Sequence, residues 1–163
     1  MRKFLYFAIA SLFVVACSNN DSANNSGGAD TASTGAATPD NSAAAIDYDE
    51  TVGTGKYNAE NFQVPATVDN DLAKKGDAIY SAKCQSCHKT TNEQLVGPGF
   101  AGVSERRTPV WIMNFLTNTD EMIDVDPALQ EQLEVCMVRM PDQALAENDA
   151  RAVIEFFRKN DGI

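Results

Sequence analysis

The run Cys84-Gln85-Ser86-Cys87-His88 constrains this chain more than any other feature of its sequence. It has the C-x-x-C-H pattern, which is typical of the covalent attachment of a c-type haem. Each thiol can form a thioether bond to the haem, and the adjacent histidine is then placed beneath the iron. A small domain with such a site must fold around a large, flat group. The motif predicts one haem c, attached at Cys84 and Cys87, with His88 as an axial iron ligand.

Two other interpretations of the motif have to be weighed. A thioredoxin-like redox pair requires a β-α-β setting, and the flanking sequence favours helix and loop. A structural zinc site could use Cys136 with the motif as a Cys₃His set, but the adjacent Cys87 and His88 cannot easily both reach one tetrahedral ion. His88 is the only histidine in the chain, so a second histidine ligand or a Ser-His-Asp triad would have to come from another chain.

The first 16 residues have the composition of an export signal. A short basic start precedes an apolar run over residues 4–16, which is too short to span a membrane. Ala16 lies directly before Cys17, and this ending resembles the lipobox of bacterial lipoproteins. The resemblance implies cleavage before Cys17 and acylation of that residue. We therefore expect a lipid-anchored protein of the bacterial cell envelope, with its domain in the periplasm and the outer face of the cell not excluded.

Composition divides the rest of the chain into three parts. Residues 17–46 are small and polar, which predicts a flexible membrane tether. Residues 47–68 mix apolar residues with turn formers, so we expect an N-terminal extension packed on the domain with little regular structure. Residues 69–163 are predicted to form the compact domain. The net charge of −10 at pH 7 disfavours nucleic acid as a partner.

The compact domain has the periodicity of an all-α fold. A helix is predicted over residues 69–82, with the haem motif at its end, and a last helix is predicted over residues 147–160. Thr108-Pro109 and Asp126-Pro127 each place a capping side chain before a proline, which indicates two further helix starts. The helix after Asp126 is predicted to bury an apolar face that consists of Leu129, Leu133, Cys136 and Met137.

Several motifs in this part of the chain combine into a familiar pattern. A helix with Gly76 and Tyr80 before the haem motif, followed by Val96-Gly97-Pro98 and Gly102-Val103, resembles class I cytochrome c, which has one haem. The resemblance covers roughly residues 69–163. It implies three to five helices around one covalent haem, with Gly76 of the first helix crossing closely against Phe156 or Phe157 of the last.

The resemblance also implies roles for residues around the haem. In the family, the carbonyl of the proline at the position of Pro98 accepts a hydrogen bond from the ring of the axial histidine, here His88. That bond would orient the ring and raise its basicity. Arg107 and Trp111 stand where family members often have donors to the haem propionates. The alternative is core packing for Trp111 and a solvated surface position for Arg107.

The second iron ligand of such haems is a methionine thioether. Met140 is followed by proline, so its backbone is extended and its side chain can project from a loop. A Met-Pro pair before the last helix is also the family's pattern, and the resemblance therefore favours Met140. Met113 and Met137 are predicted to pack within helices. After Met140, the next candidate for the iron ligand is Met137, and Met122 comes third.

The resemblance implies a one-electron carrier without catalytic residues. It would work outside the cytoplasm as a monomer, between redox partners such as a respiratory reductase or oxidase. Lys83, Lys89 and Arg139 flank the site and suggest a locally basic face for an acidic partner. The alternative is a haem sensor or enzyme whose sixth iron position is open, although a chain with one histidine has no distal histidine for peroxidase chemistry.

Overall fold

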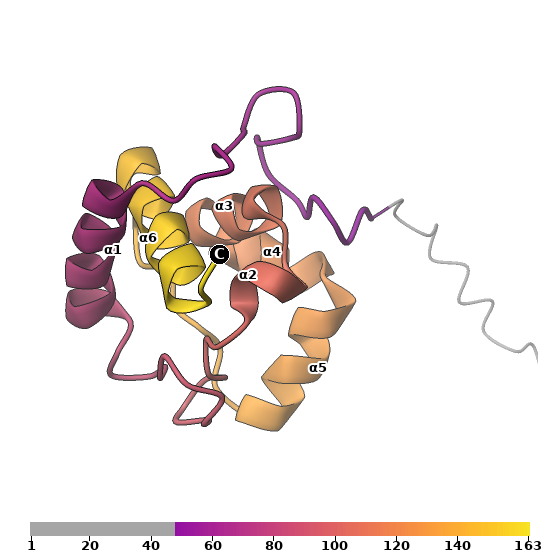
Figure 1. Cartoon of the computed structure of the whole chain (residues 1–163). Helices are drawn as coiled ribbons and strands as arrows, with labels where there is room; N and C mark the ends of the chain where they lie inside the picture. The colour runs from indigo at the N-terminus through magenta and orange to yellow at the C-terminus, as the bar shows by residue number, and fades with distance from the viewer. Residues whose placement is uncertain (1–47) are drawn as a thin grey trace, which may run out of the picture. The chain divides into compact units, whose positions relative to one another are not determined.

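The computed structural model describes residues 48–163, and this part of the chain is all-α, as predicted (Figure 1). The predicted export segment (1–16), Cys17 and the predicted tether (17–46) lie outside the described residues. None of the helices in the described part has the length and apolarity needed to cross a membrane. The helices are α1 (Asn70–Lys83), α2 (Val103–Arg106), α3 (Pro109–Thr117), α4 (Thr119–Val125), α5 (Pro127–Cys136) and α6 (Glu147–Asn160).

The described residues thus hold six helices where three to five were predicted. The difference arises from short elements, because α2 has four residues and α4 has seven. Both are too short for a periodic apolar pattern to stand out in the sequence.

Side-chain caps begin three of the helices, and two of these caps, Thr108 and Asp126, are the predicted ones. Asp69 caps α1, Thr108 caps α3 and Asp126 caps α5, and each side chain accepts hydrogen bonds from backbone N–H groups of the first turn. Pro109 and Pro127 follow two of these caps, where a missing N–H has no cost and the fixed φ suits a helix. These helix starts follow from local chemistry alone.

Helices α1 and α6 lie side by side and cross closely (Figure 1). A Cβ atom added to Gly76 would lie 2.6 Å from the carbonyl carbon of Ala152 and 2.8 Å from Cβ of Phe156. The close crossing explains why α1 keeps a glycine in its interior, and Phe156 is the aromatic residue at the contact. Tyr80, one turn further along α1, stacks on Phe156 with ring centroids 5.0 Å apart.

The segment 48–68 contains no helix and lies against α3. The fully buried side chain of Asn114 binds it through three hydrogen bonds. Its Oδ1 accepts from the backbone N–H of Tyr57 at 3.0 Å, and its Nδ2 donates to the carbonyl oxygens of Val52 and Tyr57, both at 2.9 Å. One buried amide therefore satisfies backbone groups that would otherwise be left without partners.

The predicted apolar face of α5 is correct at Leu129 and wrong at its C-terminal end. Leu129 is buried, whereas Met137 is 86% exposed. Met137 caps the helix in the left-handed conformation, with φ of 54°, so its side chain leaves the helical face. Cys136 was expected to be a buried apolar residue, but it is only half-buried and lines a cavity.

Candidate haem site

The C-x-x-C-H motif forms a tight turn directly after α1. The backbone N–H groups of Cys87 and His88 both donate to the carbonyl oxygen of Cys84, at 3.0 and 2.9 Å. All three residues line one cavity of about 380 Å³. Burial raises the pKa of the Cys84 thiol, and both cysteines of the motif are free. The turn thus presents two unpaired thiols and an imidazole to the same space.

The ring of His88 is oriented by its surroundings. Nδ1 lies 2.8 Å from the carbonyl oxygen of Pro98, and because a carbonyl only accepts, Nδ1 carries the proton and donates. Nε2 is then the nitrogen left to bind a metal. The ring stacks on Phe100, with centroids 4.4 Å apart. Burial lowers the pKa of His88, partly opposed by the bond to Pro98, which favours the neutral ring that a metal requires.

Met140 lines the same cavity as His88, in the loop between α5 and α6, and it is the only methionine among the described residues that does so. Met113 and Met122 are at most 2% exposed and pack in the core, where the sulfur of Met122 accepts a hydrogen bond from the backbone of Thr54. Met137 points into solvent. The structure therefore brings together the two residues that the sequence favoured as axial ligands.

Hydrogen bonds connect the loop that contains Met140 to α4 and to the end of α1. The guanidinium of Arg139 donates to the carboxylate of Asp124 at 2.8 Å and to the carbonyl oxygen of Asp120 at 2.7 Å, both on α4. The ammonium of Lys83, at the end of α1, donates to the carbonyl oxygen of Gln143 at 3.0 Å. The residue before the haem motif is thus bonded to the loop that holds the candidate sixth ligand.

Arg107 and Trp111 both line the cavity, but among the described residues only Trp111 has its N–H committed to another acceptor. The single N–H of Trp111 donates to Oδ2 of Asp126 at 2.9 Å. The guanidinium of Arg107 lies over the indole, 4.2 Å from its centroid. The predicted propionate contact of Trp111 is not supported by this arrangement, and the alternative of packing describes it better.

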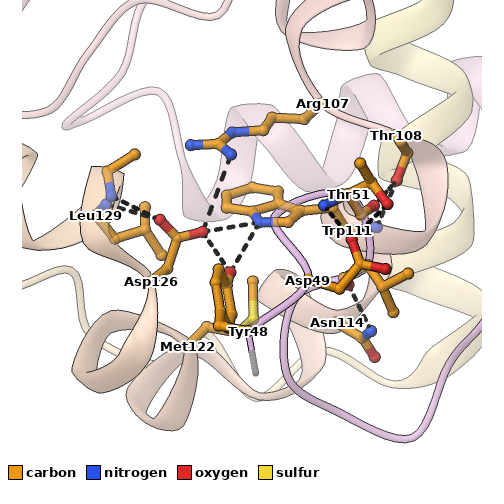
Figure 2. A network of polar contacts seen from close by, with 12 residues as sticks. Tyr48, Asp49, Thr51, Arg107, Thr108, Trp111, Asn114, Met122, Asp126 and Leu129 are labelled. Atoms are coloured by element: carbon orange, nitrogen blue, oxygen red, sulfur yellow. Dashed lines mark hydrogen bonds and ion pairs between the residues drawn. The ribbon is translucent and has the colours of Figure 1, made fainter. Parts of the chain in front are cut away.

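Two residues that contact Trp111 were not expected near the site from the sequence, namely Asp126 and Tyr48 (Figure 2). Asp126 was expected only to cap a helix, yet it also accepts the hydrogen bonds of Trp111 and Tyr48. Tyr48 lies upstream of the segment that resembles a known family, and no local pattern marks it. The only available signal was the capping position of Asp126 before Pro127.

The two competing interpretations of the motif find no support. Among residues 48–163, no three His, Cys, Asp or Glu side chains are grouped to hold a metal ion, which removes the geometric basis for a Cys₃His zinc site. The same part of the chain contains no strand, so it offers no β-α-β unit for a thioredoxin-like redox pair.

Comparison with known proteins agrees with this geometry. The family model described as Cytochrome c matches residues 73–161. A cytochrome c from Rhodothermus marinus is 30% identical, with a TM-score of 0.60 over 64% of this chain and 90% of that one. An engineered form of it bound to a carbene intermediate is 28% identical, with a TM-score of 0.57 over the same shares. No curated protein gave a significant match.

The cavity also passes a chemical test for haem. Its lining is largely apolar, two thiols at the attachment spacing face it, and a ring nitrogen with no other partner among the described residues is left for the iron. The family model covers more than half of the chain and includes every residue of this motif. The chain therefore belongs to the cytochrome c family, and its cofactor is a covalently bound haem c.

Proposed function

We propose that this chain carries single electrons between respiratory redox proteins outside the cytoplasm, on a haem iron held by His88 and Met140. Members of the cytochrome c family are usually electron carriers. The observation that supports the ligand pair most directly is that both residues line one cavity. Of the four methionines in the described part of the chain, only Met140 lines it. No catalytic residue is needed for such a function, and we propose none.

The bound haem supplies an iron that alternates between Fe²⁺ and Fe³⁺, and a histidine–methionine ligand pair raises its potential. The chain's own residues would keep this centre in one geometry. The carbonyl of Pro98 holds the ring of His88, while Lys83 and Arg139 hold the loop of Met140 from two sides. With both ligands fixed and an apolar wall limiting water, little would have to move when the charge changes.

Optical spectra of the purified protein, oxidised and reduced, test this proposal. We expect haem c bands together with the weak long-wavelength absorption band of iron–methionine ligation. That band should disappear in Met140→Ala and persist in Met137→Ala, the matched control whose side chain is exposed. If wild type lacks the band and its reduced form readily binds carbon monoxide, the sixth position is open, and a sensor or enzyme function replaces electron transfer.

We also propose that acylated Cys17 anchors the protein to a membrane of the bacterial envelope, with the haem domain in the periplasm. The proposal is supported by the export pattern of residues 1–17 and by the typical extracytoplasmic location of cytochrome c domains. Cell fractionation is the test. Wild type should sediment with membranes, and Cys17→Ser should be released in soluble form. A variant that remains in the membrane fraction would contradict lipid anchoring.

The proposed partner is a redox protein, and the basic residues beside the haem motif should add little salt-dependent attraction to it. The basic face suggested by the sequence is largely paired with acids, because Lys89 lies 2.6 Å from Glu93 and Arg139 binds Asp124. Lys83 alone of the three basic residues has no carboxylate partner among the described residues. If replacing Lys83 and Lys89 by Glu changed how the electron-transfer rate depends on ionic strength, these residues would attract the partner after all.

A further inference from the structure

A buried carboxylate lies directly behind the wall of the haem cavity. Asp126 is 1% exposed. Its Oδ1 accepts hydrogen bonds from the backbone N–H groups of Ala128 at 2.8 Å and Leu129 at 3.1 Å, in the first turn of α5 (Figure 2). One oxygen of the side chain is therefore fully used in capping the helix, and the carboxylate is held in one orientation.

The other oxygen of Asp126 joins three segments of the chain. Oδ2 accepts from the hydroxyl of Tyr48 at 2.5 Å and from Nε1 of Trp111 at 2.9 Å, and the nearest nitrogen of Arg107 lies 3.9 Å away. Trp111, Arg107 and Leu129 all line the haem cavity. The residues that contact the carboxylate thus also form the wall of the haem cavity.

The protonation states of this cluster are well defined. Burial alone would raise the pKa of Asp126, but hydrogen bonds from Tyr48, Leu129 and Trp111 and the charge of Arg107 outweigh it, so that the pKa is lowered. Burial, with a smaller contribution from the bond to Asp126, raises the pKa of Tyr48 to about 12. At neutral pH the cluster contains an ionised carboxylate, a neutral phenol and a guanidinium ion.

We propose that Asp126 is a positioning residue that lowers the reduction potential of the haem. Its carboxylate fixes Trp111 and Arg107 on the cavity wall, and its negative charge favours Fe³⁺ over Fe²⁺, because charges act over distance in a weakly polar interior. Tyr48, upstream of the family match, completes the cluster as a donor. The inference rests on the proposed electron-carrier function, since it concerns the same haem.

Redox titration of the haem-loaded, full-length protein tests this role. In Asp126→Asn the equilibrium should shift toward Fe²⁺ by about tenfold, which for one electron raises the potential by about 59 mV. Arg107→Gln removes a positive charge and should shift the potential downward. Glu131→Gln is the matched control, because it makes the same change of charge at an exposed position of α5.

The opposite signs separate an electrostatic role from a merely structural one. If both residues only kept the wall packed, either substitution would admit water and shift the potential in the same direction. Shifts of the potential in the same direction in Asp126→Asn and Arg107→Gln would overturn the proposal. A shift in Asp126→Asn no larger than that in Glu131→Gln would also overturn it. An unchanged potential together with an intact iron–methionine band would leave the electron-carrier function standing.

A milder variant keeps the test decisive if Asp126→Asn fails to retain haem. Tyr48→Phe preserves every charge but removes one hydrogen-bond donor from the carboxylate of Asp126. The negative charge of Asp126 is then less compensated by neighbouring donors. We expect a downward shift of the potential, opposite in sign to that of Asp126→Asn. An unchanged or raised potential in Tyr48→Phe would overturn the proposal.

Discussion

At the scale of single residues, Gly97 determines whether the imidazole of His88 has room. A Cβ atom added there would lie 2.8 Å from Nδ1 and 2.9 Å from Nε2 of the ring. In Gly97→Ala the ring must therefore rotate or shift away from Pro98. We expect a loss of about 1–3 kcal/mol in the free energy of unfolding, measured by denaturant titration, and a weaker bond between the iron and its proposed ligand His88, measured by optical spectra.

Leu95→Ala is the control for this substitution. Leu95 is two residues away, is 48% exposed and does not line the haem cavity. Shortening it should leave the haem spectrum unchanged. Wild-type spectra and stability in Gly97→Ala would show that the ring has more freedom than the contact distances imply.

Asp126 also makes the stability of the fold depend on pH. Its pKa is lowered in the folded protein, so its contribution is complete above the unfolded pKa of about 3.9 and is lost as the pH falls through the folded value. Asp126→Asn should therefore be less stable than wild type at pH 7, by about 1–3 kcal/mol, with the difference shrinking on acidification below about pH 4. Denaturant midpoints across this pH range measure it, and a difference that does not change with pH would contradict it.

At the scale of elements, the crossing of α1 and α6 should tolerate no side chain at Gly76. Alanine forms helix better than glycine by about 1 kcal/mol, yet its Cβ would meet the backbone of Ala152, which cannot move aside without separating the helices. We expect Gly76→Ala to lose about 1–3 kcal/mol of stability in chemical denaturation.

The opposite change at an exposed site of α1 isolates helix propensity from packing. Ala78→Gly should cost only about 1 kcal/mol, because Ala78 faces solvent. A Gly76→Ala protein as stable as wild type would mean that the two helices can move apart at little cost.

The elements that the sequence predicted well are those defined by local chemistry. Thr108 and Asp126 each precede a proline, and the haem motif is contiguous, so the helix starts and the position of the site could be inferred directly. The end of α5 could not, because Met137 takes a left-handed conformation that usually belongs to glycine. The pairing of Tyr48 with Asp126 joins residues 78 positions apart, and no local pattern encodes such a contact.

At the scale of the whole molecule, Asn114 connects the segment 48–68 to the haem domain, and we expect the stability of each to depend on this connection. Asn114→Ala would leave three backbone groups of Val52 and Tyr57 without their partners. We expect a loss of about 3 kcal/mol in stability and faster hydrogen exchange in residues 52–57. Asn70→Ala, the same substitution at an exposed position, is the control, and equal effects of the two would refute the dependence.

The contacts of Asn114 show that the family match and the packed part of the chain begin at different residues. The family match begins at residue 73, but the buried bonds of α3 reach back to Val52. A protein shortened to residues 73–163 would keep both cysteines of the haem motif, together with His88 and Met140, the two residues proposed as iron ligands. It would lack Val52 and Tyr57, whose backbone groups are bonded to Asn114 of α3. The family match is therefore shorter than the part of the chain that these buried bonds connect. A shortened protein that failed to fold would be evidence about folding and not about electron transfer.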